Sequence, residues 1–244
     1  MRVLSLDTTG RAGSLALFVD GRPADVRVGD TVRTHGQWLP GEIAAMLTAH
    51  GLTVRDVDVF AVAAGPGSFT GLRVGIATIQ GLALVTGRPV VPVSALEALA
   101  WSVRAAAGGR PIGAWIDAQR REVFAALYAA ASPPGLGPVD DFVERAAPRV
   151  GPPVDVLGAW RGPAGDVPVL LAGSGAAAYR EVILAGGHGI AAEVLGDVPP
   201  LAPAIARMAI ARAAAGGAVG PHAVVPIYVR RSDAELAREK GRGH

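Results

Sequence analysis

The chain has 244 residues, half of them apolar, and a formal net charge of +2 at pH 7. This composition favours a well-packed core over disorder, and the charge is too small to predict nucleic-acid binding by itself. The absence of cysteine excludes disulfides, thiolate nucleophiles and cysteine-ligated metals, and the single lysine, Lys240, lies too near the C-terminus for a P-loop or Schiff base.

No stretch near the N-terminus resembles a targeting segment, because Asp7 interrupts the first apolar run. The longest uncharged stretches, such as residues 74–87, are too short and too rich in glycine to span a bilayer. We therefore expect a soluble, cytoplasmic protein that makes no membrane contact.

The first part of the chain alternates strand and helix patterns, with an Asp20-Gly21 hairpin signal after the second strand. Apolar runs predict strands at residues 3–7, 14–19, 24–28, 57–64 and 89–93. Helical spacing predicts helices at residues 38–50, 70–86 and 95–105.

A second unit begins near Pro111, with a hairpin expected at residues 112–116 and 123–128. A short strand at 169–172, a helix at 177–184 and an alanine-rich helix at 203–215 follow. The segment 132–168 is rich in proline and glycine, and we expect no core there. These patterns predict an α/β protein with an N-terminal lobe at 1–108, a C-terminal lobe at 109–202, a helix at 203–215 that packs back on the first lobe, and a mobile tail at 229–244.

The predicted helix at 70–86 is unusual in its lack of charge. Arg73 is its one charged residue, and no Asp or Glu occurs between Asp58 and Glu97. An ordinary surface helix has one apolar stripe and one polar face, whereas apolar residues here populate several faces. A sheet covers one side of such a helix, so either a neighbouring helix of the same lobe or a partner subunit is expected to cover the other.

The sequence matches known catalytic and cofactor-binding motifs only in part. The G-x-G-x-x-x-G spacing of Gly65, Gly67 and Gly71 differs by one residue from a dinucleotide fingerprint, and neither Ser68 nor Ser174 lies in a G-x-S-x-G sequence. The five histidines are scattered, which argues against a metal site. Asp7-Thr8 after the first strand, and Gly173 with Gly175 after a later one, fit either plain turns or the remains of a nucleotide site.

Taken together, these segments resemble the TsaB family of tRNA threonylcarbamoyladenosine biosynthesis proteins. The most specific match is the run from Gly65 to Leu84, supported by Leu6-Asp7-Thr8-Thr9, by residues 33–40, 93–100 and 116–124, and by Pro226-Ile227-Tyr228. The match extends over most of the chain and is sparse between residues 132 and 167. Gln119 and Arg121 depart from the Arg and Gly often found after Ile-Asp-Ala in this family, so the role of that loop stays open.

The resemblance implies a two-lobed actin/hexokinase/Hsp70-like fold. It also implies a non-catalytic partner of TsaD, which transfers a threonylcarbamoyl group to adenosine in tRNAs that read codons beginning with adenine. Two metal-binding histidines of TsaD correspond here to Ala95 and Leu99, which cannot ligate a metal. The resemblance further implies the ATPase TsaE as a partner, a homodimer when TsaD is absent, and tRNA contact only through the complex.

We expect the chain to bind no cofactor tightly and to contribute to an ATP or ADP site at the joint with TsaD, with Asp7, Thr8, Gly173 and Gly175 as candidate nucleotide contacts. A charge at Ile76 is expected to abolish docking. The residues expected to contact the partner are His35, Trp38, Leu39, Ile43, Gly71, Leu72, Gly75, Ile76, Ile79 and Ala83. A small-molecule kinase or peptidase, with Asp7 or Asp117 as a candidate base in the kinase, and a homodimeric scaffold remain alternatives.

Overall fold

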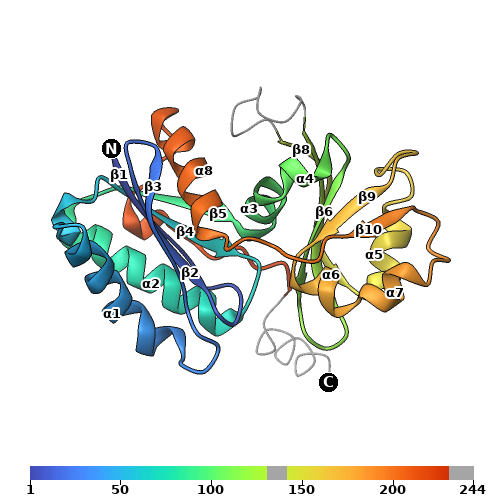
Figure 1. Ribbon diagram of the computed structural model, residues 1–244, viewed down its shortest axis with the longest axis horizontal. Helices are drawn as coiled ribbons and strands as arrows, with labels where there is room; N and C mark the ends of the chain where they lie inside the picture. The colour runs from blue at the N-terminus through green and yellow to red at the C-terminus, as the bar shows by residue number, and fades with distance from the viewer. Residues whose placement is uncertain (131–141, 231–244) are drawn as a thin grey trace, which may run out of the picture.

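A computed structural model describes residues 1–130 and 142–230 as two lobes that lie side by side (Figure 1). Each lobe is built on a five-stranded sheet, and the two sheets have matching topology. In each, the first strand pairs antiparallel with the second and parallel with the fourth. The chain is therefore an α/β protein in which one architectural unit occurs twice.

The N-terminal sheet has the order β3-β2-β1-β4-β5. Its strands are β1 (Arg2–Asp7), β2 (Ser14–Val19), β3 (Arg22–Val28), β4 (Val59–Gly65) and β5 (Val90–Ser94). Asp20 and Gly21 both have positive φ and form the tight turn that their sequence predicts. The helices α1 (His35–Ala49) and α2 (Phe69–Thr86) pack side by side on the outer face of this sheet (Figure 1), and the short η1 (Val54–Asp56) precedes β4.

The central strands of this sheet are buried on both faces, which explains their nearly continuous apolar sequence. Leu4 and Leu6 of β1 belong to the core under α1 and α2. Val3, on the opposite face, belongs to a second core that lies between the lobes. Helices thus cover both sides of the sheet.

The C-terminal sheet has the order β10-β9-β6-β7-β8. Its strands are β6 (Ile112–Asp117), β7 (Val123–Ala130), β8 (Phe142–Gly151), β9 (Val169–Ala172) and β10 (Ala192–Val194). Its helices are α5 (Pro153–Ala159), α6 (Ser174–Ala178) and α7 (Arg180–Leu184). Trp115 and Trp160, both fully buried, meet edge to face in the core that these helices cover.

The two lobes share one continuous apolar core. The helices α3 (Ala95–Ser102) and α8 (Ala202–Ala214) lie between the lobes, and α4 (Arg104–Ala107) follows α3 (Figure 1). Two buried hydrogen bonds fix the start of α8, from Ser5 Oγ to the Ala202 carbonyl (2.8 Å) and from the Ala202 amide to Ser14 Oγ (3.1 Å). The predicted helix at 203–215 therefore packs on the N-terminal sheet.

The chain crosses back between the lobes in residues 224–230, called the strap below, which follow η2 (Pro221–Ala223). The Ile227 amide donates to the Ala64 carbonyl at the end of β4 (2.7 Å), and Arg230 donates to the Ala118 carbonyl (2.7 Å) and pairs with Glu122. The expected mobile tail is thus wrong for its first two residues, Val229 and Arg230, and residues 231–244 lie outside the described part of the chain.

Sequence patterns missed several elements of the C-terminal lobe. β8 and α5 lie in the segment where no core was expected, and residues 131–141 of that segment are outside the description. β8 is an edge strand in which half of the residues are exposed and only Gly151 is buried, so it lacks an apolar run. Trp160 and the buried residues of α5 nevertheless belong to the core. The expected helix at 95–105 is interrupted at Val103, and α1 begins three residues earlier than its apolar spacing indicated.

Replacing each of two glycines of α2 by alanine is expected to change the stability of the chain in opposite directions. A Cβ at Gly75 would lie 2.2 Å from Thr8 Oγ1, whereas a Cβ at Gly81 would meet no atom within 4 Å. We expect Gly75→Ala to lower the free energy of unfolding of the monomeric chain by about 1–3 kcal/mol through overpacking. Gly81→Ala should raise it by up to about 1 kcal/mol through helix propensity. Denaturant unfolding of both variants checks this, and equal stabilities would contradict it.

Candidate docking surface and interlobe cavity

The inner side of α2 packs against the turn that follows β1. A Cβ at Gly67 would lie 2.5 Å from Thr9 Cβ, and a Cβ at Gly71 would lie 2.1 Å from the Thr8 carbonyl oxygen. Ser68 caps the helix by accepting a hydrogen bond from the Gly71 amide (3.2 Å). Only glycine permits so close an approach, so these positions fix the height and rotation of α2 on the sheet.

The outer side of α2 is exposed and carries one charge, that of Arg73. Leu84 and Val85 are 71% and 69% exposed, and they lie beside Gly81 and Ala77 along the helix. Length and composition alone would let α2 cross a membrane, but one such helix is weak evidence, because a core helix of a soluble protein meets the same criterion. Apart from Phe69 at its first position, the exposed positions of α2 are Thr70, Arg73, Ala77, Gly81, Leu84 and Val85.

α1 continues this uncharged surface beside α2. Its one acidic residue, Glu42, is half-buried and pairs with Arg27 of β3 (3.1 Å). The exposed positions of α1 are uncharged; apart from Gly36 and Ala49, near its two ends, they are Gln37, Pro40, Gly41, Ala44, Ala45 and Thr48. The six residues from Gln37 to Thr48 and the six from Thr70 to Val85 in these two lists are called the outer face below. The outer face holds no carboxylate.

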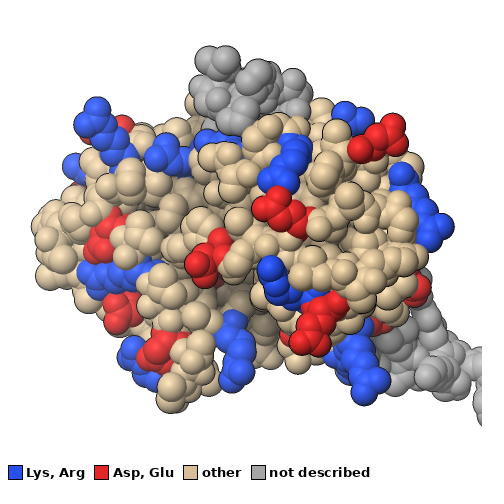
Figure 2. Space-filling view, turned by 45° about the vertical axis from the view of Figure 1, so that its right-hand side comes forward, with Lys and Arg blue, Asp and Glu red and all other residues tan. Residues whose placement is uncertain are grey.

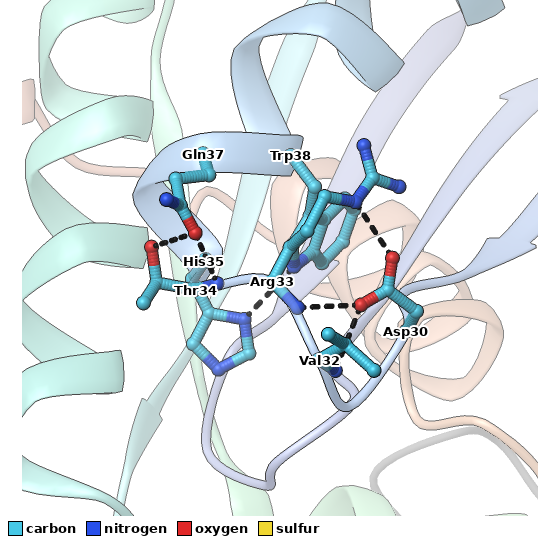
Figure 3. Close-up of polar contacts among 7 residues, drawn as sticks. All are labelled: Asp30, Val32, Arg33, Thr34, His35, Gln37 and Trp38. Atoms are coloured by element: carbon cyan, nitrogen blue, oxygen red, sulfur yellow. Dashed lines mark hydrogen bonds and ion pairs between the residues drawn. The ribbon is translucent and has the colours of Figure 1, made fainter.

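Polar contacts fix the beginning of α1, as Figure 3 shows. Gln37 Oε1 accepts hydrogen bonds from the Thr34 amide (2.8 Å) and Thr34 Oγ1 (3.0 Å). Asp30 accepts from the Arg33 amide and Nε, each at 2.6 Å, and from the Val32 amide at 2.8 Å. The Arg33 and Val32 amides and the Arg33 side chain lower the pKa of Asp30 to about 2. The first turn of α1 is therefore held in one position.

His35 ties α1 to the turn between β1 and β2. Its Nδ1 accepts from Trp38 Nε1 (3.3 Å), and its Nε2 donates to the Gly10 carbonyl (3.0 Å; Figure 3 shows the first of these bonds). Both ring nitrogens form hydrogen bonds, so the ring links the start of α1 to the turn between β1 and β2.

The structure corrects the residues expected to contact a partner. His35 is half-buried, and the other nine lie in the core of their own lobe because the most apolar stripe of each helix is the one that covers the sheet. A charge at Ile76 would therefore disrupt the lobe and would not test docking. The nine residues that are buried, and so cannot contact a partner, are Trp38, Leu39, Ile43, Gly71, Leu72, Gly75, Ile76, Ile79 and Ala83. A helical projection could have found the outer face, because Gly41, Ala44, Ala77 and Gly81 occupy the stripes opposite these core residues.

A cavity of about 1130 Å³ lies between the lobes, on the side of the strap. Thr9 and Gly10 line it from the β1–β2 turn, Ser68 and Phe69 from the start of α2, and Asp117 from the end of β6. Its basic lining residues are Arg11, Arg73, Arg120 and Arg230. In the described part of the chain, Asp117 is the one acidic residue on its wall.

The four candidate nucleotide contacts do not line this cavity, which corrects that expectation. Thr8 is completely buried, and Asp7 uses one carboxylate oxygen to accept from the Thr9 amide (2.8 Å) and Thr9 Oγ1 (2.5 Å). A Cβ at Gly173 would lie 2.1 Å from the Trp115 carbonyl oxygen, and one at Gly175 would lie 3.0 Å from Ile116 C. These glycines allow α6 to pack closely on β6.

Ala95 and Leu99, the two positions that the resemblance places at the metal ligands of TsaD, lie in the core. Ala95 is fully buried and Leu99 is 2% exposed in the core between the lobes. The Leu99 side chain fills the space beside Gly173, where an added Cβ would lie 2.6 Å from Leu99 Cδ2. Among the described residues, no group of three or more His, Asp or Glu side chains could hold a metal ion.

The paired topology of the two sheets and the cavity between the lobes define the class of protein. It is the two-lobed, ribonuclease H-like fold shared by actin, hexokinase and Hsp70. Residues 29–215 match the family described as "TsaD: tRNA N6-adenosine threonylcarbamoyltransferase". The chain therefore belongs to this family of related sequences, and it is similar to proteins of the family named TsaB.

Relatives support this placement. The chain is 38% identical over 136 residues to the tRNA threonylcarbamoyladenosine biosynthesis protein TsaB of Escherichia coli, covering 52% of this chain and 55% of that protein. The match thus spans about half the length of that relative. An uncharacterized protein of Mycobacterium bovis is 32% identical over 86% of this chain and 81% of its own. The solved structure of YeaZ from Pseudomonas aeruginosa, 29% identical, has a TM-score of 0.75 and covers 93% of this chain and 99% of its own.

The buried Asp7 predicts a specific pH dependence. Burial raises the pKa of its carboxyl above the ordinary value of 3.8, although the hydrogen bonds from Thr9 oppose the shift. The native state then binds this proton more tightly than the unfolded state, so stability falls as pH rises from 3.8 through the raised pKa. Asn can accept the same two bonds without a charge. We expect Asp7→Asn to be more stable than wild type at neutral pH, with the difference shrinking in acid.

Thermal unfolding of wild type and Asp7→Asn across pH measures this difference. Asp7→Ala, which leaves the Thr9 amide and hydroxyl without their acceptor, should be less stable than Asp7→Asn at every pH. A destabilised Asp7→Asn at neutral pH, or a difference that does not change with pH, would contradict the assignment.

Proposed function

We propose that the chain is a non-catalytic partner of a TsaD-type threonylcarbamoyltransferase, which it holds and activates through the outer face during formation of threonylcarbamoyladenosine in tRNA. The names of its relatives support the pathway. The observation that carries the docking role is the uncharged, exposed helix pair α1–α2.

Two glycines of the outer face favour docking over a plain solvent surface. Gly41 and Gly81 lie inside helices, and an added Cβ would meet no atom within 4 Å at either position. A glycine inside a helix costs about 1 kcal/mol relative to alanine, and nothing in the protomer requires it at these two positions. A surface of small residues lets a second pair of helices approach closely, as it does between packed helices elsewhere. Exposed Leu84 and Val85 would add apolar area at one edge.

A partner of the same fold fits this surface. The family description that matches the chain is that of the transferase itself, so the transferase is expected to present an equivalent helix pair. Two such pairs would form a pseudo-symmetric bundle of four helices. A second copy of the chain could use the same surface when the transferase is absent, giving an isologous homodimer.

The closed metal position supports the non-catalytic role. Leu99 and Ala95 fill the core where the transferase would hold its metal, and both nitrogens of His35, the histidine on the cavity wall, are engaged in hydrogen bonds. Substrate chemistry would then take place on the partner. In this proposal TsaE joins the same cytoplasmic assembly, and any ATP or ADP binds at the joint with the partner.

Charges on the outer face test the docking role. We expect Gly81→Glu and Ala77→Glu to fold normally, because both positions are exposed, and to lose co-purification with the TsaD-type transferase. An unpaired carboxylate buried in the interface with the transferase should weaken the complex at least about a hundredfold. Binding is measured by pull-down and calorimetry, and folding by circular dichroism.

The matched control is Ala106→Glu, an exposed alanine of α4, which should bind the transferase like wild type. Wild-type affinity in both outer-face variants would refute the docking surface. Robust turnover of ATP or cleavage of peptide by the pure chain would instead favour an enzyme of the same fold. A complex that forms but leaves the rate of tRNA modification unchanged would refute activation.

A further inference from the structure

The exposed side of α2 presents one charge that no carboxylate of the described residues balances. On the face drawn in Figure 2, acidic and basic side chains are interspersed over an uncharged surface. Along α2 the distribution differs, because Arg73 is the only charged residue of the outer face. Arg27, Arg33 and Arg230 each pair with a carboxylate, whereas Arg73 forms no ion pair within residues 1–130 and 142–230. A counter-charge for Arg73 would therefore come from another molecule.

Two aromatic residues hold the Arg73 guanidinium in place. Its Cζ lies 3.9 Å from the centre of the Phe69 ring, and its Nε lies 3.4 Å from Tyr228 Oη on the strap. The rings of Phe69 and Tyr228 in turn contact each other, with centroids 5.5 Å apart. The hydrogen bond of Arg73 runs through Nε, so its two terminal nitrogens, Nη1 and Nη2, remain available. Two parallel N–H donors of this kind match the two oxygens of a carboxylate.

Helical spacing places Arg73 where a second helix can approach α2. Ala77, Gly81 and Leu84 follow it at i+4, i+8 and i+11, so the four residues form one stripe along the exposed side of the helix. A helix packed against the small residues Ala77 and Gly81 would reach Arg73 at one end of the stripe and Leu84 at the other. The guanidinium would lose water when such a helix covers the outer face.

This loss of water discriminates between partners. A second copy of the chain presents the same outer face, which holds no carboxylate, so an isologous dimer would cover two Arg73 side chains without a counter-charge. We propose that Arg73 is a specificity-determining residue, which selects a helix pair of the TsaD-type transferase that carries a carboxylate opposite it and disfavours a second copy of this chain. The inference rests on the proposed function, because it concerns the partner of the same outer face.

Replacement of Arg73 by methionine tests this role, because methionine keeps an apolar stem beside Phe69 and removes the charge. We expect Arg73→Met to bind the transferase about tenfold more weakly than wild type and to self-associate about tenfold more tightly. Arg73→Lys keeps the charge without the fork of two donors, so its affinity for the transferase should lie between the two. Calorimetry measures transferase binding and sedimentation equilibrium measures self-association, both without nucleotide or RNA, and circular dichroism checks folding.

An exchange of charges locates the counter-charge on the partner. Arg73→Glu should lose binding to the wild-type transferase, because two carboxylates would then face each other. Replacing one Asp or Glu of the transferase helix pair by Arg should restore that binding. Failure of every such exchange would overturn the pairing.

Arg22→Met is the matched control, because Arg22 is exposed on β3, outside the outer face, and forms no ion pair within the described residues. It should behave like wild type in both assays. Arg73 also lines the interlobe cavity, and a role confined to an anion there would leave the transferase affinity of Arg73→Met unchanged, which would overturn the proposal. Equal self-association of wild type and Arg73→Met, including none in either, would also overturn it, and weakening in both assays would show a merely structural role.

The docking role is tested separately. Loss of transferase binding by Gly81→Glu and Ala77→Glu, together with wild-type binding by Arg73→Met, would overturn the role of Arg73 and leave the docking surface standing. Wild-type binding by all three variants would overturn both.

Discussion

The close contact of α2 with the turn after β1 is the constraint on which the rest of the structure depends. Gly67, Gly71 and Gly75 bring the helix backbone against Thr8 and Thr9 so closely that no side chain fits between them. This contact has two consequences. It leaves no room for a side chain between the helix and the turn, and it directs the Ala77–Gly81 side of the helix outward.

The apolar core between the lobes is a second structural constraint. α3 and α8 join both sheets in one apolar cluster, while the strap bonds β4 on one side and the β6–β7 turn on the other. Proteins that work by closing two lobes over a ligand need a joint that opens. Here packed side chains of α3 and α8 fill the part of the joint beside the cavity, and Glu97 of α3 pairs with Arg212 of α8 at 2.5 Å. Such a molecule suits a scaffold that presents fixed surfaces to a partner.

Much of the fold follows from the sequence. Continuous apolar runs marked β1, β4 and β6, and the Asp20-Gly21 pair marked its hairpin, because strands buried on both faces and tight turns have local signatures. β8 and α5 did not, because an exposed edge strand and a short helix depend on tertiary packing. Charge depletion also pointed to α1 and α2, whose outer sides are exposed and carry no charge apart from Arg73. Lack of charge alone does not choose a side, since Ile76 and Ala77 are both uncharged, whereas a helical projection places Ile76 in the most apolar stripe, which covers the sheet.

Two glycines of α2 show the same limit of sequence-based prediction more clearly. Gly75 and Gly81 look alike in sequence, yet the first is required by Thr8 and the second by nothing within the protomer. Likewise, Asp7 and Gly173 read as remains of a nucleotide site until their surroundings show a capped turn and a helix–strand contact. Whether a position serves the fold or a partner is a property of its neighbours in space.

Because the chain contains no cysteine, a single cysteine at Ala77 reports directly on whether the outer face is covered. The measurement is the rate at which a thiol reagent alkylates Ala77→Cys, with and without the TsaD-type transferase, followed by the mass of this chain. The account predicts that the transferase slows this rate at least about tenfold and leaves the rate at Ala106→Cys unchanged. An unchanged rate at Ala77→Cys in the presence of a saturating transferase would contradict it.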